Sequence, residues 1–408
     1  MNHSTISRLI AVSAAAAALI LLTSGKPVMR TTLVRTSTAD PCLVFDGSEF
    51  FLTMTGSTKI ALVSDKKLNC LTTADHPTTE NIIYDSQYDP TVDELFGEGA
   101  QINGTWSPEL HYFSEEEFPG KSGWYLYFAL RQKVLDEKGK VSSRNINTVI
   151  LKSASGSLRG PWVHPVTGVP GQTQPLLEED GSIVRRWVVG ASVLRIPSGS
   201  HAGAYITWVE EEGRGQGLGK FFQKIMISKF SAPWQLQGGQ GVITTPTQEW
   251  EFHGSSQKHP RVVEGGTAVY GDNGEVFMTY SGSGYWSDYG LGQLTLKRHG
   301  EEYEDPLVTE SWIKYEGNPV FSSVGSEELR GAGHGFFLKD AAGNRFVCFH
   351  AYPVVDGKKA KGRNAYIEPY SIDKSAACPT APDGVLRFGI KGNGKTSPVE
   401  SKFVFVSK

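Results

Sequence analysis

From residue 40 onward, the chain repeats one pattern of short apolar runs separated by glycine-rich turns. In each repeat, an apolar run leads through a turn to a second run that is rich in aromatic residues. The repeats occupy residues 40–55, 106–162, 189–234, 262–294 and 331–369. No segment sustains apolar residues at the helical period of about 3.6 residues. The pattern therefore predicts an all-β protein built from units of a few short strands joined by hairpin turns.

Five copies of such a unit indicate a five-bladed β-propeller. One small sheet cannot bury both of its faces, whereas sheets stacked radially around an axis bury each other. A β-sandwich is the competing all-β fold, but it does not explain why the same order of strands and turns returns in every unit. We expect a single propeller domain over residues 26–408, preceded by a separate segment at residues 1–25.

The N-terminal segment has the features of a secretory signal peptide. Arg8 precedes an apolar run at residues 9–22, and the small residues 23–25 follow it. The run is shorter than the roughly 20 residues that a membrane-spanning helix needs. We therefore expect a secreted, extracellular protein that has no membrane contact after cleavage. An uncleaved anchor is the alternative, because positive charges follow the run closely at Lys26, Arg30 and Arg35.

Composition limits the class of protein further. Hydrophobic residues make up 39% of the 408 residues and charged residues 20%, which allows a packed core. The formal net charge is −3 and no long basic stripe occurs, so nucleic acid is not expected as a partner. We expect a monomer.

The cysteines leave two readings open. There are four, at Cys42, Cys70, Cys348 and Cys378, and in a secreted protein they could form disulfides. Cys42 and Cys348 lie inside apolar runs, so either could instead be a buried free thiol. No spacing of cysteine and histidine indicates a zinc site.

The starts of the repeats carry most of the candidate chemistry. In a propeller, the innermost strand of every blade lines one central funnel, so positions far apart in sequence converge there. The corresponding positions hold Asp40, Glu109, Gly190, Glu264 and His334. Ionisable groups in four of the five units indicate a chemical site in the funnel.

Two of these carboxyl groups could divide the work of cleaving a glycosidic bond. One acid protonates the leaving oxygen, and in inverting enzymes a base roughly 6.5–9.5 Å away activates water. Val262 and Val263 provide an apolar approach to Glu264, which favours a raised pKa and the role of general acid. Asp40 precedes a proline and is expected to face the funnel as an ionised general base.

Other residues near the repeat starts could bind a sugar. Four aromatic residues could form walls on which sugar rings stack: Trp106, Tyr285, Trp286 and Tyr289. Glu109 and Arg363 are further candidates for substrate binding, as is His350. Glu109 could instead hydrogen-bond to the turn at Trp106. The glycines between residues 213 and 219 miss both nucleotide-binding fingerprints and predict a hairpin loop.

Several of these segments together resemble glycoside hydrolase family 43 over residues of about 36–372. They are residues 39–41 (Ala-Asp-Pro), 106–109 (Trp-Ser-Pro-Glu), the Pro-Trp pairs at 161–162 and 233–234, and residues 250–251, 264–265, 280–283 and 331–334. The resemblance implies a five-bladed propeller and inverting hydrolysis of α-L-arabinofuranosyl or β-D-xylosyl linkages in plant-type polysaccharides. The expected partner is thus a polysaccharide or oligosaccharide.

The resemblance also implies roles for single residues. It places the general base at Asp40 and the general acid at Glu264. His334 falls on a histidine that, in many arabinan-acting members, helps to hold calcium or another cation in the channel. No cofactor is required, and Ca²⁺ is the one candidate.

One position departs from the family. The family places a third carboxylate, which orients the acid and modulates its pKa, at the start of the third blade, where this chain has Gly190. Glu109 or an acidic residue at 178–180 could supply the partner instead. Otherwise the protein is slowed, uses altered chemistry, or is a carbohydrate-binding propeller without catalysis. Other propeller hydrolases, including retaining enzymes that act on fructans, complete the alternatives.

Overall fold

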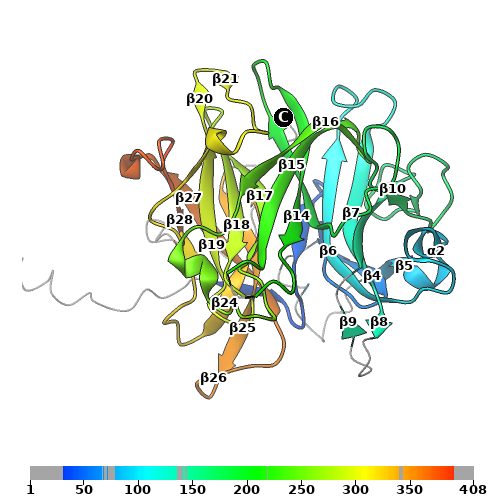
Figure 1. Ribbon diagram of the computed structural model, residues 1–408, viewed down its shortest axis with the longest axis horizontal. Coiled ribbons are helices and arrows are strands. Elements are labelled where there is room, and N and C mark those ends of the chain that lie inside the picture. Colours follow the sequence, from blue (N-terminus) through cyan, green and yellow to red (C-terminus); the bar gives the residue numbers. More distant parts are fainter. Residues whose placement is uncertain are drawn as a thin grey trace, which may run out of the picture.

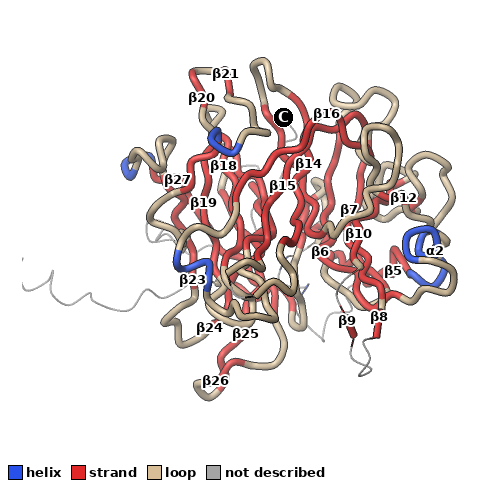
Figure 2. Tube along the Cα trace, viewed as in Figure 1, coloured by secondary structure: helices blue, strands red, loops and turns tan. Residues whose placement is uncertain are grey.

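The computed structural model describes residues 31–66, 68, 71, 79–135, 141–142, 145–217, 219–339 and 343–389. Almost all of its regular structure is β-strand (Figure 2), and its five main sheets are arranged as a five-bladed propeller (Figure 1). The predicted all-β class and five-bladed architecture are confirmed. The expected signal segment at residues 1–25 and Cys70 lie outside the described residues.

Blades 1 to 3 are antiparallel sheets whose main strands follow one another outward from the axis. Blade 1 consists of β2 (Cys42–Phe45), β3 (Phe50–Thr53), β4 (Lys59–Asp65) and β5 (Thr79–Asp85). Blade 2 consists of β6 (Ile102–Phe113), β7 (Gly123–Gln132) and β10 (Ile146–Ser153), with β11 (Trp162–Val163) and β12 (Gln174–Pro175) at its edge. Blade 3 consists of β13 (Val189–Ile196), β14 (Gly203–Glu212), β15 (Phe222–Ala232) and β16 (Gln235–Thr244).

The last two blades have more irregular outer edges. Blade 4 consists of β17 (Val263–Tyr270), β18 (Val276–Gly282), β19 (Gly290–Leu296), β22 (Trp312–Lys314) and β23 (Phe321–Ser322). Blade 5 consists of β24 (Leu329–Lys339), β25 (Arg345–Val355), β27 (Asn364–Asp373), β26 (Lys358–Lys359) and β28 (Val385–Phe388). The early strand β1 (Thr32–Arg35) pairs with β27, so the beginning of the described chain is held in the last blade.

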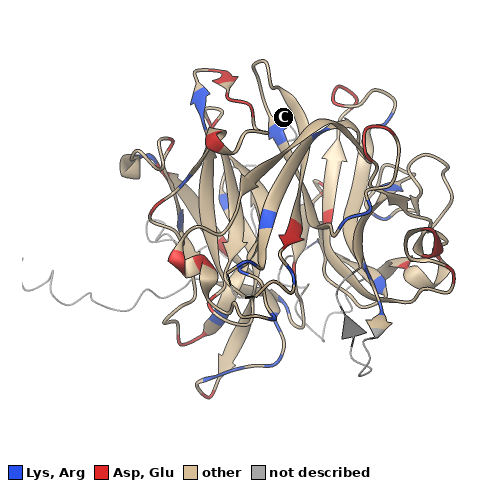
Figure 3. Ribbon diagram, viewed as in Figure 1, with Lys and Arg blue, Asp and Glu red and all other residues tan. Residues whose placement is uncertain are grey.

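A few elements lie outside the blade sheets. They are the helix α2 (Thr91–Phe96), the 3₁₀ turns η2 (Ser86–Tyr88), η3 (Glu249–Phe252), η4 (Thr309–Ser311) and η5 (Lys374–Ala376), and the two-stranded ribbons β8 (Val134–Leu135) with β9 (Val141–Ser142) and β20 (Arg298–His299) with β21 (Glu302–Tyr303). No helix within the described residues has the length and apolar character needed to cross a membrane. Charges of both signs are interspersed over the view in Figure 3.

The inner strands β2, β6, β13, β17 and β24 form a closed ring around the axis. Each contacts the inner strand of the blade before it and of the blade after it, including β24 with β2. Blade 3 accordingly lies between blades 2 and 4 in Figure 1. The ring brings residues 40, 107, 190, 264 and 334 to one end of a common channel.

The core consists of one apolar layer between every two neighbouring blades. Because side chains alternate along a strand, each blade faces both neighbours. On β7, Leu126 and Phe128 pack toward blade 1, whereas Tyr125 and Tyr127 pack toward blade 3. Because both faces of each sheet are buried, the aromatic-rich strands are apolar at almost every position and do not alternate between apolar and polar residues.

The cysteines within the described residues carry free thiols. Cys42 and Cys348 are buried in the inner parts of blades 1 and 5, and Cys378 is partly exposed. Disulfides among these three are therefore not formed, and burial raises the pKa of the Cys42 thiol. The alternative reading of Cys42 and Cys348 as buried thiols fits the structure.

Candidate active site

A pocket of about 430 Å³ lies at the end of the channel where the inner strands begin. Its lining includes most of the residues singled out from the sequence, namely Asp40, Trp106, Gly190, Glu264, Tyr285, Trp286, His334 and Arg363. These residues come from all five blades or their connections. A second cavity of about 510 Å³ is lined by later parts of the inner strands, including His111 and Tyr270, and holds neither Asp40 nor Glu264. The first pocket is therefore the candidate site.

A repeated backbone kink aims side chains into this pocket. Each blade has a residue with left-handed backbone at or just before its inner strand: Asp40 (φ 50°), Ser107 (φ 47°), Gly190 (φ 62°), Gly265 (φ 59°) and His334 (φ 53°), and blade 5 has a second one at Gly331 (φ 62°). In blades 2 to 5 the kink coincides with a shift in strand register, which is typical of a β-bulge. Bulges turn a side chain away from the regular alternation, here toward the axis.

The kink corrects the alignment of the blades that was expected from the sequence. Asp40, Gly190 and His334 do correspond, but the matching residues in blades 2 and 4 are Ser107 and Gly265. Glu264 therefore lies one position before the kink and Glu109 two positions after it. The reason is the bulge, which adds residues to the strand without a signal in the apolar pattern.

Asp40 is held by four side chains. The Thr55 hydroxyl donates to Oδ2 at 2.5 Å, and Arg363 Nη1 donates to Oδ1 at 3.3 Å. Nδ1 of His350 lies 3.2 Å and Nδ1 of His334 3.6 Å from Oδ1. Burial by itself raises the pKa of Asp40, but His334, Arg363 and His350 outweigh it and hold the pKa well below its usual range. Asp40 is thus an ionised carboxylate.

The protonation of His350 follows from its neighbours. Nδ1 of His350 accepts a hydrogen bond of 3.0 Å from the backbone N–H of Asp40. Its other ring nitrogen, Nε2, lies 3.2 Å from Arg363 Nη1, so the ring contacts two of the groups that surround the carboxylate. Burial, followed by the charge of Arg363, lowers the pKa of His350 to about 4, which keeps the ring neutral. His350 thus orients the carboxylate without adding a charge.

Glu264 has the opposite environment. Its Oε1 accepts a hydrogen bond of 2.9 Å from the buried Tyr289 hydroxyl. Burial raises the pKa of Glu264, and the charge of Asp40 adds to it, although His334 and the hydrogen bonds from Tyr289 and Gln223 act in the other direction. A Cβ at Gly265 would lie only 3.0 Å from His334 Nδ1, so this glycine lets the imidazole ring pack beside Glu264.

Aromatic side chains bound the pocket. The Arg131 guanidinium lies 4.4 Å from the Trp106 ring centroid, and that of Arg363 lies 4.6 Å from Tyr285. Trp286 packs edge-on against Tyr285 at 4.9 Å. Tyr289 corrects the prediction of a stacking wall: it is 1% exposed and does not line the pocket, because its ring stacks on His350 and its hydroxyl binds Glu264.

The other sequence candidates lie away from the pocket lining. Glu109 is buried deeper in the channel, where its Oε2 lies 2.8 Å from His111 Nε2. Glu178 forms an ion pair with Arg186, and Asp180 caps the turn at Ser182. None of these three is among the described residues that line the site, so none replaces a carboxylate at Gly190.

Among the residues at the site that were not found from the sequence, three lie next to the acid or the base. Thr55 binds Asp40, and Glu211 and Gln223 line the wall next to Glu264. The acidic triplet at 210–212 contained a usable signal, since alternation along β14 puts Glu211 on the same face as Val209. The direction in which that face points depends on the pairing of β14 with β15, however, so the sequence alone did not indicate that it lies toward blade 4.

No group of three or more histidine, cysteine, aspartate or glutamate side chains within the described residues is arranged to hold a metal ion. The ring of His334 faces Asp40 and packs on Gly265. A role of His334 in holding Ca²⁺ stays a prediction.

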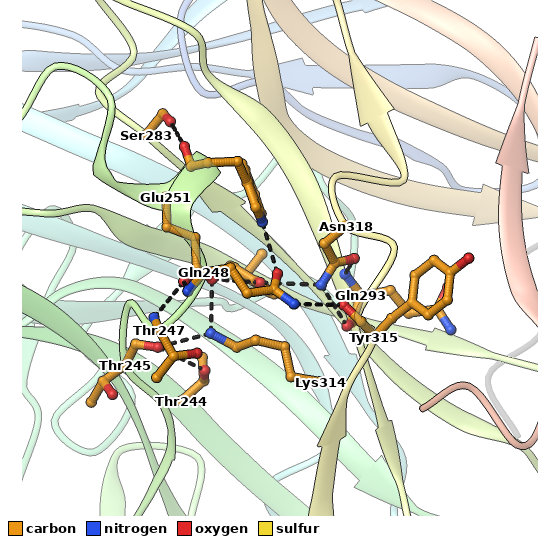
Figure 4. A network of polar contacts seen from close by, with 12 residues as sticks. Thr244, Thr245, Thr247, Gln248, Glu251, Ser283, Gln293, Lys314, Tyr315 and Asn318 are labelled. Atoms are coloured by element: carbon orange, nitrogen blue, oxygen red, sulfur yellow. Dashed lines mark hydrogen bonds and ion pairs between the residues drawn. The ribbon is translucent and has the colours of Figure 1, made fainter. Parts of the chain in front are cut away.

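A buried polar network holds one wall of the pocket (Figure 4). Glu251, in η3, is fully buried and accepts hydrogen bonds from the Tyr280 hydroxyl at 2.6 Å, Lys314 Nζ at 2.7 Å and the backbone N–H of Gln248 at 2.7 Å. The chain then continues into residues 258–262, most of which line the pocket. The network therefore ties this wall to blade 4.

We expect Glu251→Ala to lower the free energy of unfolding by about 3–5 kcal/mol, because it leaves the buried Lys314 without its counter-charge. Denaturant unfolding checks this, with the exposed neighbour Glu249→Ala as the matched control. Equal stability of the two variants would show that the Glu251 network contributes nothing.

Comparison with known proteins agrees with this geometry. The family model for glycosyl hydrolases family 43 matches residues 29–376. The chain is 28% identical over 309 residues to an extracellular exo-α-(1→5)-L-arabinofuranosidase of Streptomyces avermitilis, covering 74% of this chain and 52% of that protein. It is 25% identical over 247 residues to α-L-arabinofuranosidase 43 of Humicola insolens, covering 60% and 41%. The chain thus spans about half the length of these relatives.

Solved structures show the same fold. The α-L-arabinofuranosidase from Lactobacillus brevis superposes with a TM-score of 0.61 at 21% identity, covering 87% of this chain and 94% of that one. A thermostable family-43 glycoside hydrolase gives a TM-score of 0.61 at 20% identity, covering 92% and 99%. The match of the family model over most of the chain, together with the propeller, shows that the protein belongs to family 43 of the glycosyl hydrolases.

Proposed function

We propose that the protein is an inverting glycosidase that removes α-L-arabinofuranosyl residues, with β-D-xylosyl residues as the second candidate, from plant-type polysaccharides or oligosaccharides. The supporting observation is that one pocket contains an ionised Asp40 and a partly buried Glu264 whose pKa is raised. Two carboxyl groups in such different surroundings suit an acid and a base. The similar proteins from Streptomyces avermitilis and Humicola insolens are arabinofuranosidases, which favours the arabinofuranosyl group.

In this mechanism, Asp40 accepts a proton from a water molecule as the water oxygen attacks the anomeric carbon. Glu264 gives its proton to the glycosidic oxygen while the bond between that oxygen and the anomeric carbon breaks. The products are the leaving alcohol and a sugar of inverted anomeric configuration. Asp40 ends protonated and Glu264 ionised, and exchange with solvent restores both groups.

The aromatic and polar walls support binding of a chain end. Trp187 and Phe221 bound the pocket on the side of blade 3, and residues 258–262 bound it on the side of blade 4. Trp106, Tyr285 and Trp286 offer apolar faces, and Arg363 lies beside Asp40. A pocket of about 430 Å³ enclosed in this way suits removal of terminal sugars. Secretion fits this role, since the Streptomyces avermitilis relative is described as extracellular.

The test is turnover of aryl α-L-arabinofuranoside, aryl β-D-xyloside and α-(1→5)-linked arabino-oligosaccharide. We expect the first and third to be hydrolysed, with NMR detecting the inverted anomer as the first product. Release of the retained anomer would overturn the inverting mechanism. Binding of these sugars without turnover, unchanged in Glu264→Gln, would favour a carbohydrate-binding propeller without catalysis, which the glycine at position 190 motivates.

Thr55→Val tests the base more finely. Its hydroxyl donates to Asp40 Oδ2 and accepts from the Ser107 backbone N–H at 2.9 Å, so it stabilises the ionised carboxylate. Its loss raises the pKa of Asp40, and we expect the acid limb of the kcat profile to move to higher pH. Thr53→Val is the matched control, because the buried Thr53 hydroxyl has no partner within the described structure. An unmoved acid limb in Thr55→Val would contradict this role.

A further inference from the structure

Position 190 leaves room beside the acid. The nearest atoms that a Cβ there would meet are Val209 Cγ2 at 3.8 Å and the Gly265 backbone nitrogen at 3.9 Å, which are ordinary contacts. The second of these atoms belongs to the residue that follows Glu264. The glycine therefore places no side chain of its own beside the acid.

The neighbouring strands of blade 3 supply side chains to the same wall. Val209 pairs with Val189 across β13 and β14, and Glu211 follows two residues later on the same face of β14. Gln223 on β15 lies directly opposite Glu211 in the register. Both Glu211 and Gln223 line the pocket, whereas the intervening Glu210 points away and pairs with Arg186.

Backbone contacts hold this pair of side chains next to the acid. The Gln223 N–H donates to the Arg261 carbonyl at 2.9 Å, and Arg261 N–H donates to the Phe221 carbonyl at 3.0 Å. The start of β15 is thereby joined to the segment that leads into Glu264. The buried Gln223 lines the pocket together with Glu211 and Glu264 and lowers the pKa of both carboxyl groups, so its side chain lies near both.

The electrostatics agree with this placement. The Glu211 side chain is 8% exposed and forms an ion pair with Arg214. Burial, with a further contribution from the charge of Glu264, raises the pKa of Glu211 to about 7, although Arg214 and Gln223 oppose the rise. The other charged or titratable groups that face Glu264 are Asp40, His334 and Tyr289. Two buried carboxyl groups this close favour states that share a proton.

We propose that Glu211 takes the place of the carboxylate missing at position 190, as a positioning residue that orients Glu264 through Gln223 and favours its protonated form. The inference rests on the proposed function of Glu264 as the general acid. The ion pair with Arg214 favours the ionised form of Glu211. In this proposal, the positioning carboxylate comes from the second strand of blade 3, β14, and not from its inner strand, β13.

Kinetics of Glu211→Gln test this role. Without the neighbouring negative charge, the Glu264 proton is lost at lower pH, so we expect the basic limb of the kcat profile to move down by about 1 pH unit. We expect kcat on an α-(1→5)-linked arabino-oligosaccharide to fall about tenfold or more, with KM little changed. Turnover of a 4-nitrophenyl arabinofuranoside falls less, because that leaving group needs little protonation. Glu212→Gln, an exposed substitution on the same strand, is the matched control.

A restoring variant separates the proposed role from a structural one. Aspartate fits the left-handed backbone at the corresponding place in blade 1, where Asp40 has φ 50°, so Gly190→Asp is accommodated. We expect Gly190→Asp in the Glu211→Gln background to recover activity on the oligosaccharide and the basic limb. A wild-type pH profile and leaving-group dependence in Glu211→Gln would overturn the inference while leaving the hydrolase intact.

Carboxyl titration tests the coupling without turnover. Difference infrared spectra of wild type against Glu264→Gln report the Glu264 carboxyl, and its midpoint should fall in a Glu211→Gln background but not in a Glu212→Gln background. An equal midpoint in both backgrounds overturns the inference. If the wild type hydrolyses none of the sugars while the midpoint still falls, the coupling stands and the proposed function fails.

Discussion

Glu264→Gln is expected to lower kcat on arabino-oligosaccharide by about 10²–10⁴-fold, because the leaving alcohol then departs without a proton. The glutamine is close in shape and can still accept from the Tyr289 hydroxyl, so the pocket should keep its form. An aryl arabinofuranoside with an acidic leaving group should lose much less activity. The ratio of the two losses is the measurement, and equal losses on both substrates would contradict the role of acid.

We expect the same residue to set the alkaline side of the pH profile. Burial raises the pKa of Glu264 above the ordinary glutamate value of 4.5, so the acid stays protonated to higher pH than an exposed glutamate. Activity should fall as the pH rises through this raised pKa. On the acid side, activity should persist below the ordinary aspartate value of 3.8, because the pKa of Asp40 is lowered. The observed limits belong to the coupled carboxyl groups rather than to single residues.

Asp40→Ala is expected to lower kcat by about 10²–10⁴-fold on both the oligosaccharide and the aryl substrate. The loss is the same because the base acts on water and not on the leaving group. The variant leaves Arg363, His334 and His350 around an empty anion position. Azide, a nucleophile that needs no proton removed, should bind there and restore part of the turnover.

The product of that rescue identifies the role of Asp40. Attack by azide from the side of the missing carboxylate gives a glycosyl azide of inverted configuration. Azide should give no rescue in Glu264→Gln with the oligosaccharide, which provides the matched comparison. A glycosyl azide of retained configuration, or a smaller loss in Asp40→Ala than in Thr55→Val, would contradict the assignment of Asp40 as base.

The apolar pattern was sufficient for the architecture. Five repeats of strand, turn and aromatic strand predict the propeller because each sheet must bury both faces, and the five apolar layers between blades fulfil that requirement. The same reasoning brought Asp40, Glu264, His334 and Gly190 to one end of the channel, where the structure places them in one pocket. Convergence around an axis follows from the repeat alone.

The apolar pattern did not predict how the side chains at the end of the channel are oriented. Tyr289 was expected at the sugar but lies behind the pocket, with its hydroxyl on Glu264. Glu109 was expected at the pocket but pairs with His111 deeper in the channel. Both differences arise because a bulge or a turn of one or two residues rotates the side chains that follow it, while the apolar spacing hardly changes.

By itself, the sequence determined the all-β class, the number of blades and the end of the channel at which chemistry is concentrated, because these depend on the alternation and repetition of apolar residues. Only the tertiary structure brought Glu211 into the same pocket as Glu264. The placement of Glu211, on the second strand of blade 3, depends on the pairing of β14 with β15 and on the contact of β15 with the segment before β17. Contacts of this kind produce no periodic pattern of apolar residues in the sequence.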